Sequence, residues 1–339
     1  MNGPLRFGVI GAGRVGTLHC ELLAHGVEGA AVSAVCDVDR DRAAAAAALA
    51  RGAIAIADPA ELIGSPDVDA VAICSATDTH AELIEAAAAA AKPVFCEKPV
   101  ANEPAAVERA CAAAERAGIV FQVGFNRRFD PAHRAVHDAV NEGEIGTPQL
   151  LRITSRDPEP PPRDYVEVSG GLYLDMSAHD FDMARFVAGS EVTEVFSRGA
   201  AAIDPSLEEI GDVDTALTVL VHANGCLTAI DNSRRAAYGY DQRVEAFGPG
   251  GMACSENPPP FPARTLTASG DRTPPPAQFF LDRYRESYRR GWEAFLAAVA
   301  GGESASVGAD DARAALAIGL AARRSRAEGR AVTVAEAGA

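Results

Sequence analysis

Short apolar runs alternate with longer helix-compatible segments through the first 124 residues. The first run, Leu5–Ile10, is too short for a helix and ends at a glycine, so it predicts a buried strand. Further strands are expected at 31–36, 54–56, 68–74, 94–96 and 119–124, with helices between them. This alternation predicts an α/β fold with a parallel, doubly wound sheet of the Rossmann type.

The pattern changes after Gly124, where strands begin to follow one another directly. Asn224-Gly225 between two of them is a strong hairpin signal. The strands are expected at 148–155, 192–198, 216–222, 227–232 and 243–247, and the helices at 136–142, 172–187, 279–300 and 310–328. The proline-rich loop at 157–163 can be neither helix nor central strand. A longer proline-rich stretch covers 258–276.

These patterns predict two domains. Residues 1–124 would form the doubly wound domain, and residues 125–339 an α+β domain with a large open antiparallel sheet and helices on one face. The uncovered face of such a sheet needs a partner, and a second copy of the chain is the natural candidate. We therefore expect a homo-oligomer.

A glycine-rich turn marks a nucleotide site in the first domain. Gly11-Ala-Gly13-Arg-Val-Gly16 follows a strand and opens a helix, and Asp37 ends the next strand. Such glycines let the backbone approach a pyrophosphate, and the helix N-terminus offers free N–H groups. Asp37 would accept ribose hydroxyls and repel a 2′-phosphate, which favours NAD over NADP. A glycine turn in a domain without a nucleotide is the alternative.

Composition excludes several other classes of partner. The net charge of −16 argues against nucleic acid and anionic membranes. The seven cysteines form no CxxC pair and no cluster at zinc spacing, so we expect neither a disulfide framework nor a metal site. The N-terminus lacks a signal-peptide pattern and no apolar stretch is long enough to span a bilayer. These features favour a cytoplasmic protein.

Lysine is rare in this arginine-rich chain, with copies only at Lys92 and Lys98. Lys98 follows a predicted strand, at the edge where ligands of a doubly wound sheet bind. Unlike arginine, lysine is a compact ammonium whose pKa shifts readily, so it can share a proton with a reacting oxygen. Lys98 is therefore a candidate for chemistry, the alternative being the chance survival of an exposed lysine.

A second cluster lies at the start of the helix predicted at 172–187. Asp175 and His179 are four residues apart, so on a helix they can touch, and a carboxylate raises the basicity of an imidazole. Asp182 shares their face, whereas Asp180 is expected to be a cap or a surface group. Oxidising an alcohol with nicotinamide needs a base and a positive group at the hydroxyl, and His179 and Lys98 could supply them. A solvated acidic helix start is the alternative.

Several motifs together resemble the glucose–fructose oxidoreductase/inositol dehydrogenase (Gfo/Idh/MocA) family over essentially the whole chain. They are the glycine turn, Ala76-Thr-Asp-Thr-His80, Glu97-Lys98-Pro99 and the Asp175-to-His179 spacing. Others resemble its inositol 2-dehydrogenase branch, namely residues 124–131, 154–158, 169–171, 179–185 and 232–243.

The resemblance implies NAD-dependent oxidation of myo-inositol to scyllo-inosose (2-keto-myo-inositol) in inositol catabolism. It gives Lys98, Asp175 and His179 as the catalytic residues, a cis Lys98–Pro99 bond and a tetramer that pairs sheets across subunits. The expected cofactor contacts are Gly11, Ala12, Gly13, Arg14, Val15, Gly16, Asp37, Val38, Ser75, Ala76, Thr77, His80, Glu97 and Lys98.

An inositol carries six hydroxyls and needs many polar contacts. The expected substrate-binding residues are Lys98, Arg127, Asp157, Asp175, His179, Asp182, Tyr238 and Gln242. Arg127 and Asp157 could instead form an ion pair between domains, Tyr238 could pack in the sheet, and His80 could cap its helix. The alternative functions are a dehydrogenase for another inositol or sugar (scyllo- or chiro-inositol, glucose, an aldose), an NAD-requiring glycosidase, and a non-enzymatic NAD-binding regulator.

Overall fold

The computed structural model describes residues 3–337, which form two compact units. Unit 1 contains the residues up to Asn126 together with Glu286–Ala314. Unit 2 contains Arg127–Arg285 and the residues from Ala315 onwards. The last third of the chain therefore contributes to both units.

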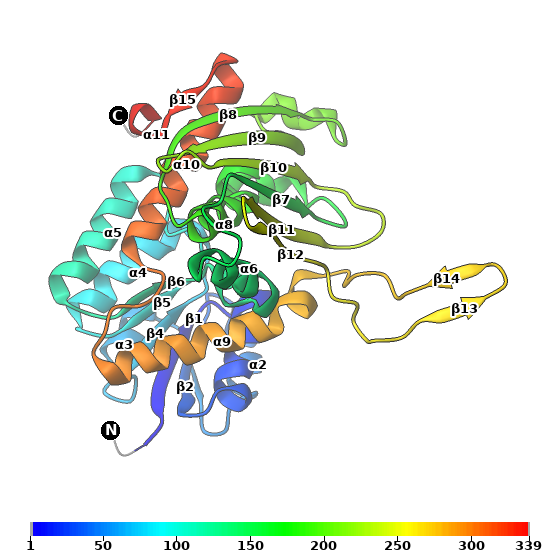
Figure 1. Ribbon diagram of the computed structural model, residues 1–339. Coiled ribbons are helices and arrows are strands. Elements are labelled where there is room, and N and C mark those ends of the chain that lie inside the picture. Colours follow the sequence, from blue (N-terminus) through cyan, green and yellow to red (C-terminus); the bar gives the residue numbers. More distant parts are fainter. Residues whose placement is uncertain (1–2, 338–339) are drawn as a thin grey trace. The chain divides into compact units, whose positions relative to one another are not determined.

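Unit 1 is built on a six-stranded parallel sheet in the order β3-β2-β1-β4-β5-β6 (Figure 1). Its strands are β1 (Leu5–Ile10), β2 (Ala30–Cys36), β3 (Ile54–Ile56), β4 (Ala70–Ile73), β5 (Val94–Cys96) and β6 (Phe121–Val123). Its connections carry α1 (Arg14–Glu21), η1 (Leu22–Gly26), α2 (Arg40–Ala47), α3 (Pro59–Gly64), α4 (Thr77–Ala89) and α5 (Pro104–Ala117). The predicted doubly wound sheet is confirmed, and strand order reverses between β1 and β4, the point where such sheets bind ligands.

The core of unit 1 is completed by a helix from the far end of the sequence. In α9 (Phe280–Gly301), Trp292 is fully buried. Its ring lies 5.2 Å from that of Phe7 on β1 and 4.2 Å from that of Phe95 on β5, centroid to centroid. Large aromatic side chains contribute most per residue to a core, so this helix stabilises the sheet through β1 and β5.

Unit 2 is built on a seven-stranded sheet in the order β12-β11-β7-β10-β9-β8-β15. Its strands are β7 (Leu150–Arg156), β8 (Val192–Ala200), β9 (Thr215–His222), β10 (Leu227–Ser233), β11 (Asp241–Gly248), β12 (Gly251–Ser255) and β15 (Val332–Thr333). The predicted antiparallel sheet needs one correction, because β7 and β10 pair in parallel. Their connection is long enough to include two further strands, β8 and β9, and so it can bring β10 back in the same direction.

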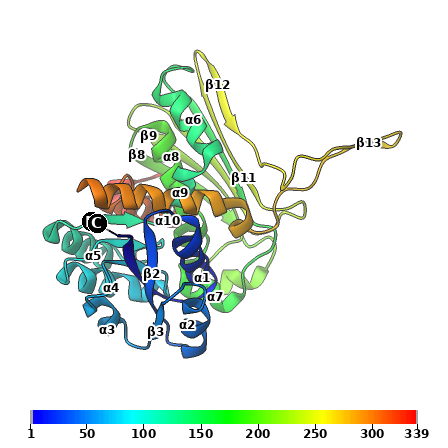
Figure 2. The same cartoon turned by 90° about the horizontal axis from the view of Figure 1, so that it is seen from below.

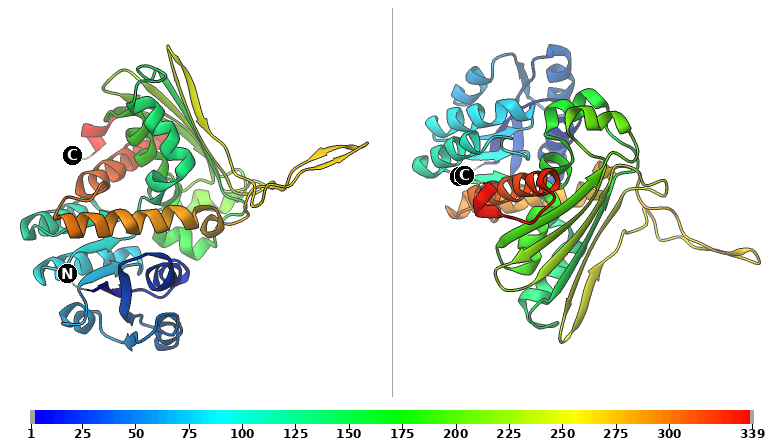
Figure 3. Two further views of the ribbon diagram at one scale, coloured as in Figure 1. Left: turned by 60° about the horizontal axis from the view of Figure 1, so that its bottom comes forward. Right: turned by 90° about the horizontal axis from the view of Figure 1, so that it is seen from above.

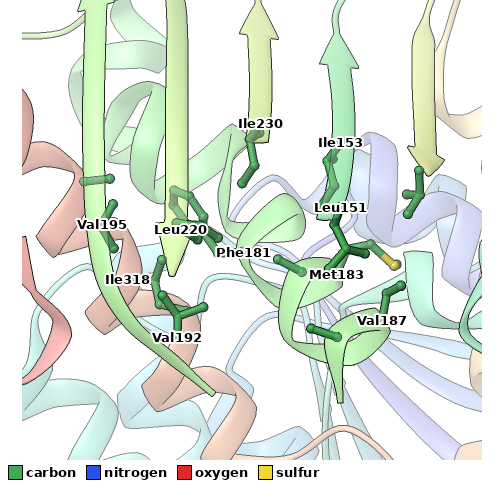
Figure 4. Close-up of a cluster of buried hydrophobic side chains, with 14 of the residues drawn as sticks. Leu151, Ile153, Phe181, Met183, Val187, Val192, Val195, Leu220, Ile230 and Ile318 are labelled. Atoms are coloured by element: carbon green, nitrogen blue, oxygen red, sulfur yellow. The ribbon is translucent and has the colours of Figure 1, made fainter. Parts of the chain in front are cut away.

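One face of this sheet packs on helices. These are α6 (Pro131–Asn141), α8 (Ala178–Ala188) and the unit 2 part of α10 (Ala309–Glu328). Figure 4 shows Leu151, Ile153 and Ile230 from the strands facing Phe181 and Met183 of α8, all of them buried. Among residues 3–337 no helix covers the other face (Figure 3), and large apolar side chains stand exposed on it: Phe196, Leu217, Val219, Leu227, Phe247 and Met252.

Several segments differ from their sequence-based predictions, and two strands, β12 and β15, were not expected. The helix expected at 172–187 is divided at Ser177 into a π-helical turn, η3 (Leu172–Met176), and α8. A short helix, α7 (Arg163–Ser169), follows the first proline-rich loop. Inside the second stretch, β13 (Thr265–Thr267) and β14 (Gly270–Arg272) form an exposed hairpin that extends away from the sheet (Figure 2). It forms because the prolines flank the two strands and do not interrupt them.

The remaining elements are short: η2 (Asn126–Phe129), η4 (Pro205–Ile210) and α11 (Val334–Ala337). Within residues 3–337, none of the helices combines the length and the apolar character needed to cross a bilayer.

Candidate active site

The first loop of unit 1 makes the sharp turn that a nucleotide site needs. Gly11 has a φ of +95°, in the region that favours glycine. A Cβ there would lie 2.5 Å from the backbone of Cys74 and Ser75, which follow β4. The loops after β1 and β4 therefore touch at the point where strand order reverses, and any larger residue would push them apart.

The next glycine leaves the start of α1 open. Gly13 is the N-cap of α1, no side chain caps the helix, and its first turn holds no acidic residue. A Cβ on Gly13 would meet no atom within 4 Å, so a ligand can approach this backbone closely. Free N–H groups and the positive end of the helix dipole are what a pyrophosphate requires.

Asp37 stands beside this turn at the end of β2. Its carboxylate accepts the N–H of Ala12 at 2.6 Å and that of Asp39 at 2.8 Å, which fixes it against the glycine loop. Val38, the next residue, is fully exposed, an unusual position for an apolar side chain. A ribose on Asp37 and an adenine on Val38 would satisfy both features. These residues therefore fit NAD.

The loop after β4 carries Ser75, Ala76 and Thr77, and α4 begins there without a side-chain cap. The ring of His80 is buried and lies 3.0 Å from the carbonyl oxygen of Ser75 and 2.8 Å from that of Pro99. Burial lowers the pKa of His80. Both ring nitrogens thus face backbone, and His80 connects this loop to the turn that follows Lys98.

Lys98 follows β5 at the same edge of the sheet, and its bond to Pro99 is cis, as the family resemblance implied. The preceding carboxylate is oriented by two buried residues that the sequence did not reveal. The indole N–H of Trp292 donates to Nδ1 of His19 at 2.9 Å, so the proton of His19 is on Nε2, which donates to Glu97 at 2.9 Å. The backbone N–H of Lys98 also donates to Glu97, at 3.2 Å. This chain fixes the backbone from which Lys98 extends.

In unit 2, the helix-facing side chains of three neighbouring strands change from apolar to polar at one end. On β7 the row Leu151 and Ile153 continues as Ser155 and then Asp157. On β10 the row Thr228 and Ile230 continues as Asn232 and then Arg234, and Gln242 begins the corresponding row on β11. Asn232 and Gln242 both stand in register with Ser155. The strands therefore place a polar layer at one end of the apolar core.

A buried hydrogen-bond network fills the inner part of this layer. Arg127 donates to one oxygen of Asp180 at 2.6 Å, and Asn232 donates to the other at 2.8 Å. Ser177 donates to the amide oxygen of Asn232 at 3.0 Å, and Arg127 also reaches Ser155 at 3.4 Å. Asp180 is fully buried, so the expectation that it is a cap or a surface group is wrong. Burial raises the pKa of Asp180, and Arg127 and Asn232 oppose that shift.

Asp182 lies in a second buried pair. Its two oxygens accept from Arg128 at 2.9 Å and 2.5 Å, a two-bond geometry that leaves the carboxylate firmly held. A third buried pair, Arg283 with Asp130, joins α9 to the N-cap of α6 at 2.5 Å. Arg127 and Asp182, both expected to bind substrate, are thus already engaged with protein partners.

The rest of the polar layer, including Asp157 and Gln242, is less fully bonded. Asp157 lies 3.7 Å from Arg234, whereas Arg127 pairs with Asp180. Burial raises the pKa of Asp157 to about 6, and Arg234 and Arg127 oppose the shift. Gln242 is 1% exposed, and neither of its side-chain polar atoms has a hydrogen-bond partner among the described residues. Buried polar groups normally find partners, so this part of the layer is suited to a polar ligand.

Asp175 and His179 flank the division between η3 and α8. Asp175 is buried and His179 half-buried. Ser177 and Asp180, between and beside them, belong to the buried network, which therefore fixes the turn that carries both residues. Tyr238, about half exposed, belongs to a different network, in which its hydroxyl accepts from Arg156 at 2.9 Å and donates to Asp241 at 2.6 Å.

Other kinds of site find little support. Within residues 3–337, His, Cys, Asp and Glu form no group of three or more that could hold a metal ion. All seven cysteines are free, and burial raises the pKa of the Cys74 and Cys96 thiols well above the ordinary value. Neither thiol is therefore an activated nucleophile.

The doubly wound sheet, its open glycine turn and the carboxylate at the end of β2 define a nucleotide-binding domain of the dehydrogenase type. Residues 5–125 match the oxidoreductase family with an NAD-binding Rossmann fold, and residues 133–254 match the GFO/IDH/MocA C-terminal domain. The chain belongs to the Gfo/Idh/MocA family of oxidoreductases, and its cofactor is NAD. The family and the cofactor predicted from the sequence are confirmed.

Similar proteins cover nearly the whole chain. A myo-inositol 2-dehydrogenase of Thermotoga maritima is 46% identical over 98% of this chain and 99% of its own length. An inositol 2-dehydrogenase of Rhizobium meliloti is 42% identical over 98% and 99%. Among solved structures, a myo-inositol dehydrogenase of Lactobacillus casei in complex with NAD(H) and myo-inositol is 26% identical, with a TM-score of 0.87 over 97% of this chain and 96% of that one.

Proposed function

We propose that this protein is a myo-inositol 2-dehydrogenase that oxidises myo-inositol to scyllo-inosose in inositol catabolism. The observation that carries the proposal is 46% identity, over almost the full length of both chains, to a myo-inositol 2-dehydrogenase. The incompletely bonded polar layer of unit 2 supports it, because a polyol offers the hydroxyls that these groups lack.

The proposed mechanism assigns one role to each catalytic residue. NAD supplies the hydride acceptor when it is bound. His179 takes the proton of the hydroxyl that is oxidised, and Asp175 holds its imidazole in the required orientation. Lys98 provides a positive charge for the oxygen as alkoxide character develops. Residues 1–124 are proposed as the NAD-binding domain and residues 125–339 as the substrate-binding and oligomerisation domain, except that Glu286–Ala314 belongs to the same compact unit as the first domain.

For the substrate contacts we propose that Asp157 and Gln242 bind ring hydroxyls directly. Arg127 and Asp182, held in buried ion pairs, position the start of α8. Tyr238 remains a proposed contact at the edge of the site. Because all seven cysteines are free, we further propose that the enzyme works in the reducing cytoplasm.

The substrate proposal is tested by NADH formation with a panel of myo-, scyllo- and chiro-inositol, glucose and other hexoses. We expect kcat/KM to be highest for myo-inositol. A clear preference for scyllo-inositol or glucose would contradict the proposal. An aryl glycoside that releases sugar without net NADH would instead identify a glycosidase.

We propose a homotetramer in which the uncovered face of the unit 2 sheet packs against a second copy. The exposed Leu217 and Val219 on β9 and Leu227 on β10 make that face apolar, and such patches mark interaction surfaces.

Sedimentation equilibrium should give a mass four times that of one chain, and Leu217→Asp should yield smaller species. Ile54→Asp, which alters an equally accessible apolar side chain of unit 1, should leave the mass unchanged. A wild-type monomer at micromolar concentration would contradict the proposal.

A further inference from the structure

The guanidinium of Arg234 is the least satisfied buried cation in the polar layer of unit 2. Arg234 is only 4% exposed, yet its Nε and Nη2 atoms have no hydrogen-bond partner among the described residues. Its Nη1 lies 3.7 Å from Asp157, an ion-pair distance beyond hydrogen-bond reach. Burying a charged group whose N–H donors have no acceptor costs free energy. Such donors are therefore expected to bind a ligand or water.

The position of Arg234 is set by the backbone. Its N–H donates to the carbonyl oxygen of Asp214 at 2.8 Å. The buried carboxylate of Asp214 in turn accepts the N–H groups of Ala202, Ile203 and Asp204 at 2.7 to 2.9 Å. The N–H of Asp157 donates to the carbonyl of Ser233 at 2.9 Å, so Asp157 and Arg234 start from adjacent, fixed points of the sheet. The two side chains therefore start from neighbouring backbone positions, yet their charged groups lie 3.7 Å apart, too far for a hydrogen bond.

The two unbonded atoms define the shape of the missing partner. Nε and Nη2 form one edge of the guanidinium and present two parallel donors, a geometry that fits two acceptor oxygens side by side. Either a carboxylate or two neighbouring hydroxyls offers such a pair. Asp175 and Asp180 lie near enough to Asp157 to act on it electrostatically, so negative charge gathers around Arg234. The chain as a whole carries a net charge of −16. The surrounding carboxylates disfavour an anion and favour a neutral diol.

We propose that Arg234 binds two adjacent ring hydroxyls of the substrate through its Nε and Nη2 edge, while Asp157 accepts a hydrogen bond from a neighbouring hydroxyl. The proposal rests on the proposed function and adds a residue that determines specificity for polyols. Arg234 selects substrates with oxygens on neighbouring carbons. The carboxylates beside Arg234 exclude charged sugar acids.

The test compares Arg234→Met with Arg235→Met, because Arg235 is the neighbouring arginine and is exposed. Loss of two charge-assisted hydrogen bonds should raise KM for the preferred polyol about 10- to 100-fold in Arg234→Met. Affinity for NAD, measured by fluorescence titration, should stay unchanged in both variants, and Arg235→Met should retain the wild-type KM.

A second readout uses inositols that lack one hydroxyl. The wild type should lose kcat/KM about tenfold or more for each missing hydroxyl that Arg234 binds. In Arg234→Met the same analogues should differ little from the parent polyol. Arg234→Lys, which keeps the charge and loses the paired donors, provides the comparison if the methionine variant folds poorly.

The substrate preference of the wild type and the role of Arg234 are decided by different measurements. A wild type that prefers another cyclic polyol overturns the substrate assignment, and the Arg234 comparison is then made on that polyol. An Arg234→Met enzyme whose KM and analogue discrimination match those of Arg235→Met overturns the role of Arg234. Weaker NAD binding or a lower melting temperature with an unchanged KM would show that Arg234 has a structural role. This result would also overturn its role in substrate binding.

Discussion

Lys98→Arg is expected to lower kcat by about 100- to 10,000-fold, the range by which a well-placed proton-sharing group accelerates a reaction. Arginine keeps the positive charge but is broader, never gives up its proton and presents a planar fork in place of a compact ammonium. The backbone at Lys98 is fixed by Glu97 and His19, so the larger head group cannot be accommodated by a shift of the turn. The measurement is steady-state NADH formation together with a fluorescence titration of NAD.

The chain offers a matched control in its only other lysine. Lys92 donates to the carbonyl of Ser65 at 2.7 Å, at the end of α3, and has no part in the proposed chemistry. Lys92→Arg should therefore keep kcat near the wild-type value. The two variants should bind NAD alike. If Lys98→Arg turned over as fast as Lys92→Arg, the proton-sharing role would have to be given to another residue.

The fold of unit 1 was predictable because its signals are local. Each strand is an apolar run bounded by glycine or a polar residue. Parallel strands that are buried on both faces are recognised by such a run alone, without alternating polar residues. The contribution of α9 was not predictable in this way. Trp292 meets Phe7 across nearly the whole length of the chain, and no spacing in the sequence records that contact. The parallel pairing of β7 and β10 was not predicted for the same reason, because it joins strands that are far apart in the sequence.

The site was predictable in outline only. The positions of Gly11, Asp37, Ser75 and Lys98 after the strands of unit 1 were predictable, because strand ends gather at one edge of a doubly wound sheet. Their roles in binding remain proposals. Which polar residues of unit 2 already have partners depends on long-range contacts, so the buried role of Asp180 was missed. Arg234 could have been found, since alternation along β10 puts it on the same face as Ile230 and Asn232.

Removal of the carboxylate of Asp180 is expected to destabilise unit 2 by about 3 to 5 kcal/mol, as measured when one partner of a buried ion pair is deleted. Asp180→Ala leaves Arg127 buried without a counter-charge and removes a hydrogen-bond acceptor from Asn232. Urea unfolding followed by circular dichroism reports the change. Fluorescence of Trp292, the only tryptophan, reports unit 1 separately.

The control is an exposed ion pair of the same unit. Glu209 pairs with Arg163 at 3.0 Å, and 70% of its side chain is exposed. Glu209→Ala should change the unfolding midpoint little, because such pairs contribute little to stability. The double variant Arg127→Met, Asp180→Leu should recover much of the loss, since an apolar pair carries no unpaired charge.

Stability and catalysis should nonetheless separate in that double variant. Asp180 and Asn232 hold Ser177, and with it the turn between η3 and α8 that carries Asp175 and His179. Apolar replacements restore the packing but not these hydrogen bonds, so kcat should stay low although the protein is folded. If the double variant regained full activity, the buried network would serve only to fill the core. If Asp180→Ala unfolded at the same urea concentration as Glu209→Ala, then Ser155 and the rest of the layer would be enough to accommodate the charge of Arg127.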